Sequence, residues 1–305
     1  MELLQLKYFQ TVAHLEHMTR AAEELHIPQP ALSKTISLLE KELDVLLFDR
    51  RGKYIYLNEY GKTFLKRVDE ALTALENGKH ELMDLSGKTF GDIKLVILSA
   101  SSLIPELLAS FRKQYPHINF NLIQHFSNSV SPTDFDLCIY SSALKLDNIN
   151  NIPLITEEIF LAVPAEHPLA THNSIKLNEV ATDDFISLKR GKDLREITDI
   201  FCKYSGFTPN VIFESDDPAT VRGLIRAGQG IAFIPAISWG GSTGSSMKLL
   251  HIDEPICERT ISLTFTAERY LPKAARLFRQ FTIDYFANLN LDDHKNLNNN
   301  AQSKK

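Results

Sequence analysis

The sequence of 305 residues predicts a multidomain fold in which an all-α N-terminal part and one long helix precede a two-lobed α/β part. Three observations support this prediction. Residues 1–58 combine helical hydrophobic periodicity with turn signals. Residues 59–87 continue a helical pattern over more length than one small domain needs. From Gly91 onward, short apolar runs alternate with helical patterns, which is typical of βαβ units.

Residues 18–37 predict two short helices joined by a tight turn, which is a helix-turn-helix. The break falls at His26, Ile27 and Pro28, and Thr19 is the expected N-cap of the first helix. Apolar residues recur along the second helix at the spacing that places them on one face. That face carries Leu32, Ile36, Leu39 and Leu43, and the opposite face carries Pro30, Ser33, Lys34, Ser37 and Lys41.

The segment at about 48–57 predicts a wing, a hairpin beside the helix pair. Basic residues flank Gly52, and the alternating sequence YIYL that follows is typical of a strand. In a helix-turn-helix the N-terminal residues of the second helix meet base edges in the major groove. Gln29 can pair with adenine, and Ser33 can serve any base or a phosphate. The expected DNA-binding residues are Thr19, Arg20, Gln29, Pro30, Ser33, Lys34, Ser37, Arg50, Arg51 and Lys53.

An ordinary amphipathic helical hairpin would give the same helix pattern, and the wing is what favours a DNA-binding domain. Charge does not decide the question. Residues 1–61 hold seven lysines and arginines against nine aspartates and glutamates, a formal charge of −2. This charge disfavours a polycation that binds DNA without sequence preference, and the cations are expected to act by their placement. Lys41, at the far end of the second helix, is expected to face solvent.

These residues resemble the N-terminal signature of the LysR-type transcriptional regulators. The sequence AAEELHI-x-QPALSKTI-x-x-LE-x-EL-x-V-x-LF-x-R, followed by L-x-x-x-G, fills most positions of that signature. The resemblance implies a winged helix-turn-helix dimer on a linker helix, with an effector domain resembling type II periplasmic binding proteins. Two positions depart from the family. Pro28 replaces the usual Ser or Thr cap, and Asp44 replaces the usual Gly after the recognition helix.

The linker helix is expected over residues 59–87, with Asn58 as its N-cap. Its apolar residues follow alternating steps of three and four, which is a heptad seam. The seam favours a symmetric dimer, or a tetramer built from two dimers, that binds an imperfect inverted repeat in promoter DNA. A core helix inside one domain is the alternative. The expected dimer contacts are Phe64, Val68, Ala71, Leu75, Leu82 and Leu85.

The α/β part divides into two expected lobes. Residues 91–161 and 265–289 form the first lobe, and residues 162–264 form the second. The strings HPLA, GKDLREITDIF and TVRGLIRAGQGIAFIP resemble the LysR-type effector domain, so the resemblance covers nearly the whole chain. Residues 290–305 are polar and rich in Asn, which predicts a disordered tail.

A small-molecule effector is expected between the lobes, where helix N-termini meet the C-terminal ends of strands and attract anions. Serines follow the first strand, and cations precede a helix of the second lobe, which favours a carboxylate or another small anion. The alternative is that the serines cap a helix and the cations are solvated. The expected effector-binding residues are Ser99, Ser101, Ser102, Lys189 and Arg190, joined by Asn128, Ser129 and Pro209 on the positions that the family resemblance implies.

The overall composition, 44% hydrophobic and 23% charged, is that of a globular protein. No run approaches the roughly 18 apolar residues of a membrane span, and the N-terminus lacks the pattern of a signal sequence. We therefore expect a cytoplasmic protein without a membrane partner. Three separated cysteines, Cys138, Cys202 and Cys257, argue against a disulfide framework or a zinc site.

The sequence gives less support to other functions. An enzyme would need a nucleophile with a base or a metal cluster, and no G-x-S-x-G, H-E-x-x-H or glycine-rich phosphate loop is present. We expect no cofactor, and His167 is expected in a turn before Pro168. A thiol-responsive regulator of the same architecture is the sharper alternative, although Asp193 stands where peroxide-sensing relatives carry a reactive Cys. RNA polymerase is an expected partner at the promoter.

Overall fold

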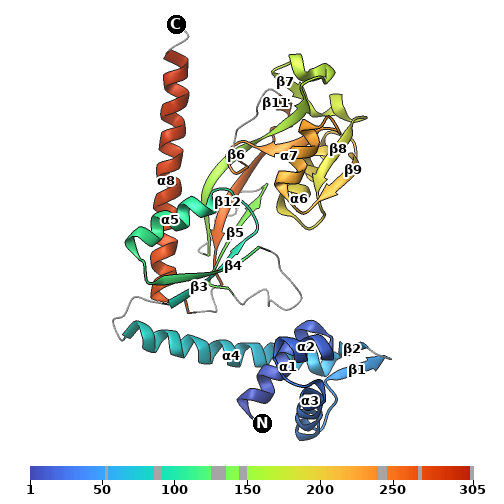
Figure 1. The fold of residues 1–305 in the computed structure, drawn as a ribbon, viewed down its shortest axis with the longest axis vertical. Coiled ribbons are helices and arrows are strands. Elements are labelled where there is room, and N and C mark those ends of the chain that lie inside the picture. Colours follow the sequence, from blue (N-terminus) through green and yellow to red (C-terminus); the bar gives the residue numbers. More distant parts are fainter. Residues whose placement is uncertain are drawn as a thin grey trace. The chain divides into compact units, whose positions relative to one another are not determined.

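The computed structural model describes residues 1–51, 54–85, 91–124, 135–143, 150–239, 246–266 and 270–302. These residues form two compact units, a helical N-terminal unit and a larger α/β unit (Figure 1). The first unit contains α1 (Leu3–Leu15), α2 (Met18–Glu24), α3 (Gln29–Leu43), the strands β1 (Phe48–Arg51) and β2 (Tyr54–Leu57), and α4 (Glu59–Leu85). This is the predicted order of helix pair, wing and linker helix.

The core of the N-terminal unit forms where α1, α2, α3 and the start of α4 meet. Phe9 is fully buried, and its ring centroid lies 5.6 Å from that of Phe48 and 5.2 Å from that of Phe64. Leu32, Ile36 and Leu39 of α3 are also buried, as their helical spacing predicts. The apolar face of α3 is thus fixed on the core, which leaves its opposite face to solvent.

The ends of the two helices differ in how well the sequence predicted them. Thr19 lies inside α2 and is not its cap, so that prediction was wrong. The N-cap is His17, whose Nδ1 accepts the N–H of Arg20 at 3.3 Å, because an imidazole nitrogen can replace a hydroxyl as acceptor. Pro28 occupies the N-cap of α3 without a side-chain hydrogen bond, and Asp44 ends α3 with φ of 53°. Both departures from the family pattern therefore lie where the sequence placed them.

The linker helix α4 divides into two halves. Val68 and Leu72 are buried against the N-terminal core, and Phe64 packs on the same core. Val68 was predicted as a dimer contact, and its burial in the core of its own chain contradicts that role. Phe64 is only partly buried, and its predicted dimer contact stays a prediction. Farther along, Leu75, Leu82 and Leu85 are 52%, 70% and 83% exposed. The apolar stripe is therefore continuous in sequence but buried only in its first half.

The α/β unit is built on a mixed sheet whose strand order is β4-β3-β5-β12-β6-β11-β7, with β10 pairing to β6. A separate parallel pair is formed by β8 and β9. The strands are β3 (Gly91–Ile97), β4 (Ile118–Ile123), β5 (Leu137–Ser142), β6 (Asn151–Pro164), β7 (Ser174–Lys176), β8 (Asp184–Leu188), β9 (Asn210–Ser215), β10 (Ala232–Pro235), β11 (Met247–Glu254) and β12 (Glu258–Thr264). The helices are α5 (Ile104–Gln114), α6 (Asp193–Tyr204), α7 (Pro218–Arg226) and α8 (Lys273–Gln302), with 3-10 turns at Pro168–Thr171 and Leu177–Val180.

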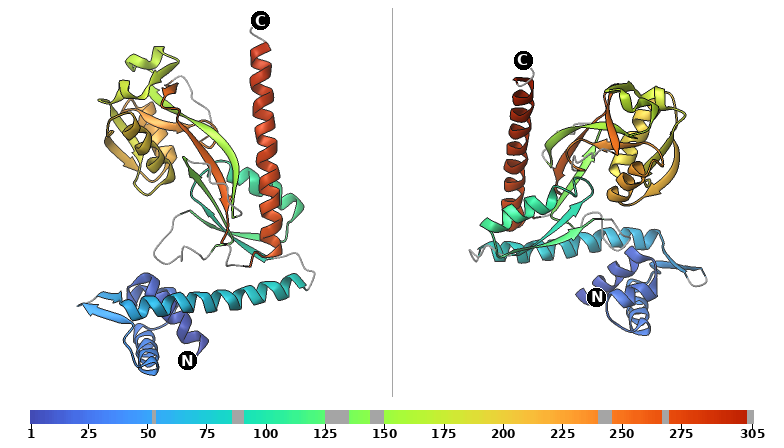
Figure 2. Two further views of the ribbon diagram at one scale, coloured as in Figure 1. Left: turned by 180° about the vertical axis from the view of Figure 1, so that it is seen from behind. Right: turned by 45° about the horizontal axis from the view of Figure 1, so that its top comes forward.

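Two long antiparallel strands join the lobes of this unit. β6 pairs with β12 over its first half and with β10 and β11 over its second half. In Figures 1 and 2, β6 (yellow-green) and β12 (orange) run side by side between the lobes. The first lobe holds the parallel strands β4, β3 and β5, and the second holds α6, α7 and the pair β8 and β9. These two strands therefore link the two lobes.

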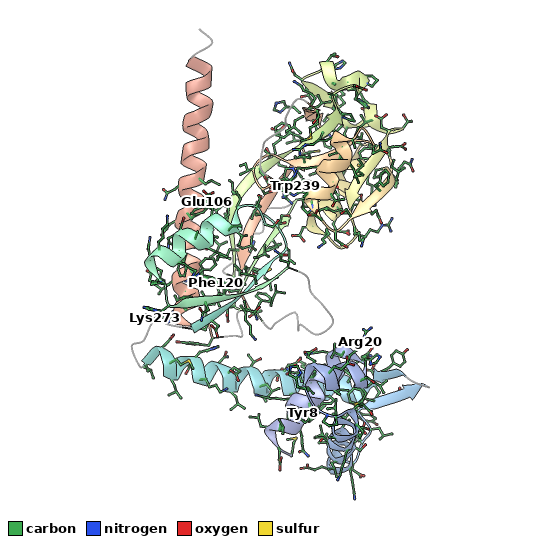
Figure 3. The ribbon with its side chains drawn as sticks, in the orientation of Figure 1. Tyr8, Arg20, Glu106, Phe120, Trp239 and Lys273 are labelled. Carbon is green, nitrogen blue, oxygen red and sulfur yellow. The ribbon has the colours of Figure 1, made fainter. Side chains whose placement is uncertain are left out.

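α8 packs on the first lobe through aromatic rings. The ring centroid of Phe278 lies 5.0 Å from that of Phe111 in α5 and 4.9 Å from that of Phe120 in β4. Phe120 is labelled in Figure 3. The backbone of α8 is helical to Gln302. The disordered tail expected at 290–305 stays a prediction. A helix that is already anchored gains one hydrogen bond per added residue without a new nucleation cost, which favours its extension into polar sequence.

Candidate DNA interface and candidate effector site

The exposed face of α3 carries the residues predicted to meet DNA. Gln29, Pro30, Lys34 and Ser37 are exposed, and Ser33 is half-buried beside Leu32. Because the buried face of α3 is held by the core, these side chains project from a rigid helix. Their contact with bases remains a prediction.

Two further groups of predicted DNA contacts flank α3. Thr19 and Arg20 are exposed on α2, and Arg20 is labelled in Figure 3. The wing is a two-stranded antiparallel hairpin in which Arg50 pairs with Ile55 and Arg51 with Tyr54. The side chains of Arg50 and Arg51, and the whole of Lys53, lie outside the described residues.

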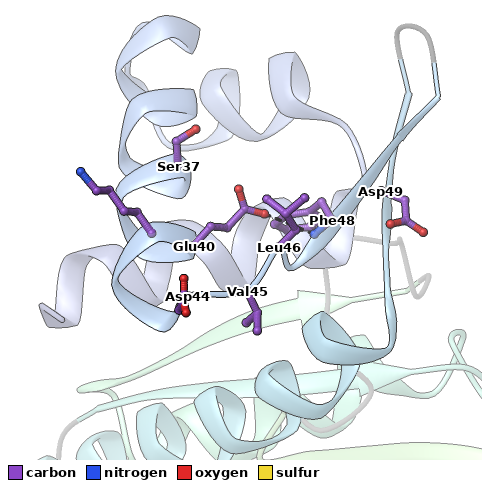
Figure 4. Close-up of a pocket in the computed structure, with 8 residues that line it drawn as sticks. Ser37, Glu40, Asp44, Val45, Leu46, Phe48 and Asp49 are labelled. Carbon is purple, nitrogen blue, oxygen red and sulfur yellow. Dashed lines mark hydrogen bonds between the residues drawn. The ribbon is translucent and has the colours of Figure 1, made fainter.

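A buried carboxylate holds the wing against the recognition helix. Glu40 is 8% exposed, and its Oε1 accepts the backbone N–H of Leu47 at 2.8 Å and of Phe48 at 3.3 Å. Beside it lies a pocket of about 610 Å³ (Figure 4). Three of its lining residues are acidic, which disfavours a phosphate ligand. The pocket is lined by Ser37, Glu40, Lys41, Asp44, Val45, Leu46, Phe48 and Asp49.

In the α/β unit, a buried polar network lies where the paired strands β6 and β12 run from one lobe to the other. The guanidinium of Arg259, on β12, donates from Nε to Glu157 Oε1 at 2.9 Å and from Nη2 to Ser238 Oγ at 2.6 Å. Glu157, on β6, also accepts the backbone N–H of Ser238 and of Ile237, each at 2.8 Å. Arg259 and Glu157 are each 2% exposed, so their charges are compensated almost entirely by one another and by these donors.

The network continues into the first lobe through two serines. Arg259 Nη1 donates to Ser141 Oγ at 3.2 Å, and the hydroxyls of Ser141 and Ser99 lie 2.8 Å apart. Ser99 follows β3, and Ser141 lies in β5, so both stand at the C-terminal ends of adjacent parallel strands. Between Ser99 and Ser101, the buried residue Ala100 has φ of 60°, a left-handed conformation that costs a non-glycine residue about 1–2 kcal/mol. Strain of this kind is typical of sites where the backbone must present particular groups.

A carboxylate from the second lobe completes this network. Asp193, the first residue of α6, accepts the backbone N–H of Ser141 at 2.7 Å and the hydroxyl of Ser99 at 3.3 Å through the same Oδ2. The hydroxyl of Ser102 donates to the carbonyl of Ser238. The predicted serines are therefore not helix caps, since the N-cap of α5 is Leu103 and it makes no side-chain cap bond.

The structure does not bring all the predicted effector residues together. Ser99 and Ser102 join the network, and Ser101 is exposed beside them. The ammonium of Lys189 instead pairs with Asp216 at 2.6 Å on the surface. Arg190 is exposed and Pro209 is half-buried, and for both a ligand role remains a prediction. Asn128 and Ser129 lie outside the described residues.

Sequence reasoning missed the central members of the site. Glu157, Ser141, Ser238 and Arg259 were not predicted, and Asp193 was considered only as a replacement for a reactive cysteine. A signal was available for two of them. Glu157 and Arg259 are charged residues within strands, and a charge at a buried strand position requires a partner.

The three cysteines are free and buried. Burial, together with the nearby charge of Asp193, raises the pKa of the Cys138 thiol to about 12. Burial likewise raises the pKa of Cys202 and of Cys257 to about 12. Because the thiolate is the reactive species, such thiols are poor redox sensors. His167 accepts the N–H of Leu169 at 3.2 Å in the turn at Pro168, as predicted.

Within the described ranges, no three His, Cys, Asp or Glu side chains form a group suited to a metal ion. Nor does any helix described there have both the length and the apolarity to cross a membrane.

The fold and its two sites define a DNA-binding regulator with a ligand-binding domain. The model of the bacterial regulatory helix-turn-helix proteins of the lysR family matches residues 3–62, and that of the LysR substrate binding domain matches residues 90–287. This chain therefore belongs to the LysR family of transcriptional regulators.

Relatives and solved structures agree with this assignment. The chain is 39% identical to YybE, an uncharacterized HTH-type transcriptional regulator of Bacillus subtilis strain 168, over 94% of this chain and all of the relative. It is 34% identical to the transcriptional dual regulator GltC of the same strain, over 95% of this chain and 99% of the relative. Full-length OxyR C199D from Pseudomonas aeruginosa shares the fold, with a TM-score of 0.66, 22% identity and coverage of 92% and 94% of the two chains.

A solved effector domain supplies a third comparison. The effector binding domain of QuiR in complex with shikimate has a TM-score of 0.56 and 26% identity, and it covers 66% of this chain and 99% of its own.

We predict that Arg259→Met destabilises the α/β unit by about 3–5 kcal/mol, because it leaves the Glu157 carboxylate buried without its cation. Urea unfolding followed by the fluorescence of the single tryptophan, Trp239, measures this effect, since Trp239 is buried in the second lobe. Lys189→Met is the control, because it removes an exposed cation and should leave the unfolding midpoint unchanged. Equal midpoints for the two variants would contradict the prediction.

The raised cysteine pKa values predict slow thiol chemistry. At pH 8 a disulfide reagent should label the native protein at least about a hundredfold more slowly than the urea-unfolded protein, which should react at all three cysteines. The native rate should rise as pH increases towards 12, because only then do the thiolates form. Rapid labelling of one native cysteine at pH 8 would reinstate a thiol-responsive mechanism.

Proposed function

We propose that this LysR-family chain is a sequence-specific regulator whose promoter contacts change when a small anionic effector binds between the lobes of the α/β unit. The observation that carries the DNA half is the exposed polar face of α3, whose other face is locked into the core. The regulator acts without catalysis of its own, and RNA polymerase is its expected partner at the promoter.

The proposal includes a dimer, or a tetramer built from two dimers, on an imperfect inverted repeat. Support comes from the second half of α4, where Leu75, Leu82 and Leu85 are largely exposed, and Met83 is 57% exposed beside them. Burying such a stripe against a second copy removes apolar surface from water. Ala71 is also exposed and extends the same half.

An anionic effector is supported by the donors at the ends of β3 and β5. The N–H of Ser141 and the hydroxyl of Ser99 already bind one carboxylate, that of Asp193, so this place suits a negative oxygen. The related QuiR domain was solved with shikimate, which is itself a carboxylate. GltC is a dual regulator, which is consistent with a chain whose outcome at a promoter depends on its effector.

We predict that Ser33→Ala and Lys34→Ala each weaken operator binding by about 1–3 kcal/mol. The measurement is a gel shift on the intergenic DNA beside the protein's own gene, at fixed salt concentration. Lys41→Ala is the matched control, because Lys41 is an exposed lysine on the same helix but lies at its C-terminal end. Binding that is unchanged in both test variants would contradict the assignment of α3 as the base-contacting helix.

A separate prediction tests whether an anionic effector binds the α/β unit. A thermal-shift screen of carboxylates and amino acids should find a ligand that raises the melting temperature of the parent protein. That rise should disappear in the double variant Ser101→Ala/Ser102→Ala, because these serines stand at the N-terminal side of α5 in the proposed site. A double variant that responds as the parent does would remove both serines from the effector site.

A further inference from the structure

A carboxylate of the chain itself occupies the strand ends where the effector is proposed to bind. Asp193 Oδ2 accepts both the Ser141 N–H, at 2.7 Å, and the Ser99 hydroxyl, at 3.3 Å. The serines belong to the first lobe and Asp193 to α6 of the second. The contact therefore joins the two lobes by placing an anion on donors that an external anion would also use.

The hydroxyls of the network are aligned for a negative group. A guanidinium can only donate hydrogen bonds, so Ser141 Oγ accepts from Arg259 Nη1. With Ser99 donating to Asp193, the bond between the two hydroxyls must run from Ser141 to Ser99. Each hydroxyl dipole thus points its hydrogen towards the carboxylate, and successive bonds of this kind strengthen one another. The order is Arg259, Ser141, Ser99, Asp193, from fixed cation to anion.

Asp193 does not serve as the cap of its own helix. The N-cap of α6 is Lys192, and the carboxylate that reaches back over this helix end is Glu196, which accepts the N–H of Gly191 at 2.9 Å. The Asp193 side chain is directed instead to residues 52 and 94 positions away in the sequence.

The helix that carries Asp193 is firmly joined to the second lobe. Arg195, two residues along α6 and 4% exposed, donates to the carbonyl of Leu188 at 3.1 Å, to Glu214 at 2.8 Å and to Asp199 at 2.8 Å. These bonds tie α6 to β8 and β9. Loss of the Asp193 contact would therefore release α6, together with the strands bound to it, from this contact, and not merely one side chain.

We propose that Asp193 is an internal occupant of the anion-binding position, and that an anionic effector acts by displacing its carboxylate from Ser141 and Ser99. The effector then exchanges an intramolecular anion for an external one and uncouples α6 from the first lobe. This inference rests on the proposed effector-controlled function for its role in regulation. The exchange itself is a property of the α/β unit and can be measured without DNA.

The test uses the full chain with Asp193→Ala and sodium formate, the anion that corresponds to the deleted carboxyl group. Melting temperatures are compared in formate and in chloride at equal ionic strength. The variant should gain about 3 °C when formate reaches ten times its Kd, whereas the parent, whose position is filled, should show no formate-specific gain. The double variant Asp193→Ala/Ser99→Ala should lose most of the gain.

The matched control is Asp216→Ala, which removes another carboxylate of the second lobe and frees the exposed ammonium of Lys189. It should show no formate-specific gain, because an exposed lysine does not form an enclosed anion site. A gain of the same size in the parent, in the Asp216 variant or in the double variant would overturn the proposal. So would a folded Asp193→Ala protein that formate does not stabilise.

Hydrogen exchange at the Ser141 amide gives a local measurement that does not depend on global stability. Asp193→Ala should raise its exchange rate at least tenfold, and formate should restore most of the protection. If the alanine variant does not fold, Asp193→Asn takes its place, since the amide keeps the volume but loses the charge. Its Ser141 amide should exchange faster than in the parent, and formate should slow it; behaviour identical to the parent in both respects would overturn the proposal.

These outcomes separate the inference from the proposed function. Formate rescue together with failed operator binding would leave Asp193 as the occupant of an anion site and remove the regulatory role. Operator binding and a carboxylate effector that uses Ser101 and Ser102, without any formate response in the Asp193 variant, would leave the function standing and overturn the displacement of Asp193.

Discussion

The α/β unit depends on a buried ion pair between Arg259 and Glu157, which lie opposite one another on the two paired strands that join its lobes. Two opposite charges with almost no exposure are tolerable only where every donor and acceptor finds a partner. Glu157 therefore fixes the backbone at Ile237 and Ser238, and Arg259 orients Ser141. The polar site between the lobes exists because the donors and acceptors of this buried ion pair all need partners.

The N-terminal unit is held together mainly by apolar contacts in one core. Phe9 packs against rings from the wing and from α4, so helix pair, wing and linker helix share one core. Glu40 adds a buried charge, and it accepts two backbone N–H groups where the wing begins. The side chains predicted to contact DNA can vary on such a scaffold without disturbing its core, because they lie on the opposite face of α3.

Much of this architecture could be predicted from the sequence because local patterns encode it. The spacing of Leu32, Ile36 and Leu39 predicted which face of α3 is buried, and Asp44 was placed correctly as its left-handed terminus. Predictions failed where a residue other than the predicted one capped a helix, or where a residue predicted at a dimer interface filled the core of its own chain. His17 caps α2 in place of Thr19, and Val68 fills the N-terminal core although its heptad position suggested a dimer contact.

The sequence by itself determined the class of the protein, the order of its elements and the apolar faces that fold them, because periodicity and turn chemistry act over a few residues. Only the tertiary structure decided which distant groups meet. Asp193 lies 52 residues from Ser141, and Glu157 lies 102 residues from Arg259, yet each pair is within hydrogen-bond distance. No local pattern encodes such a contact, since it exists only when the sheet brings its strands together and desolvates the charges.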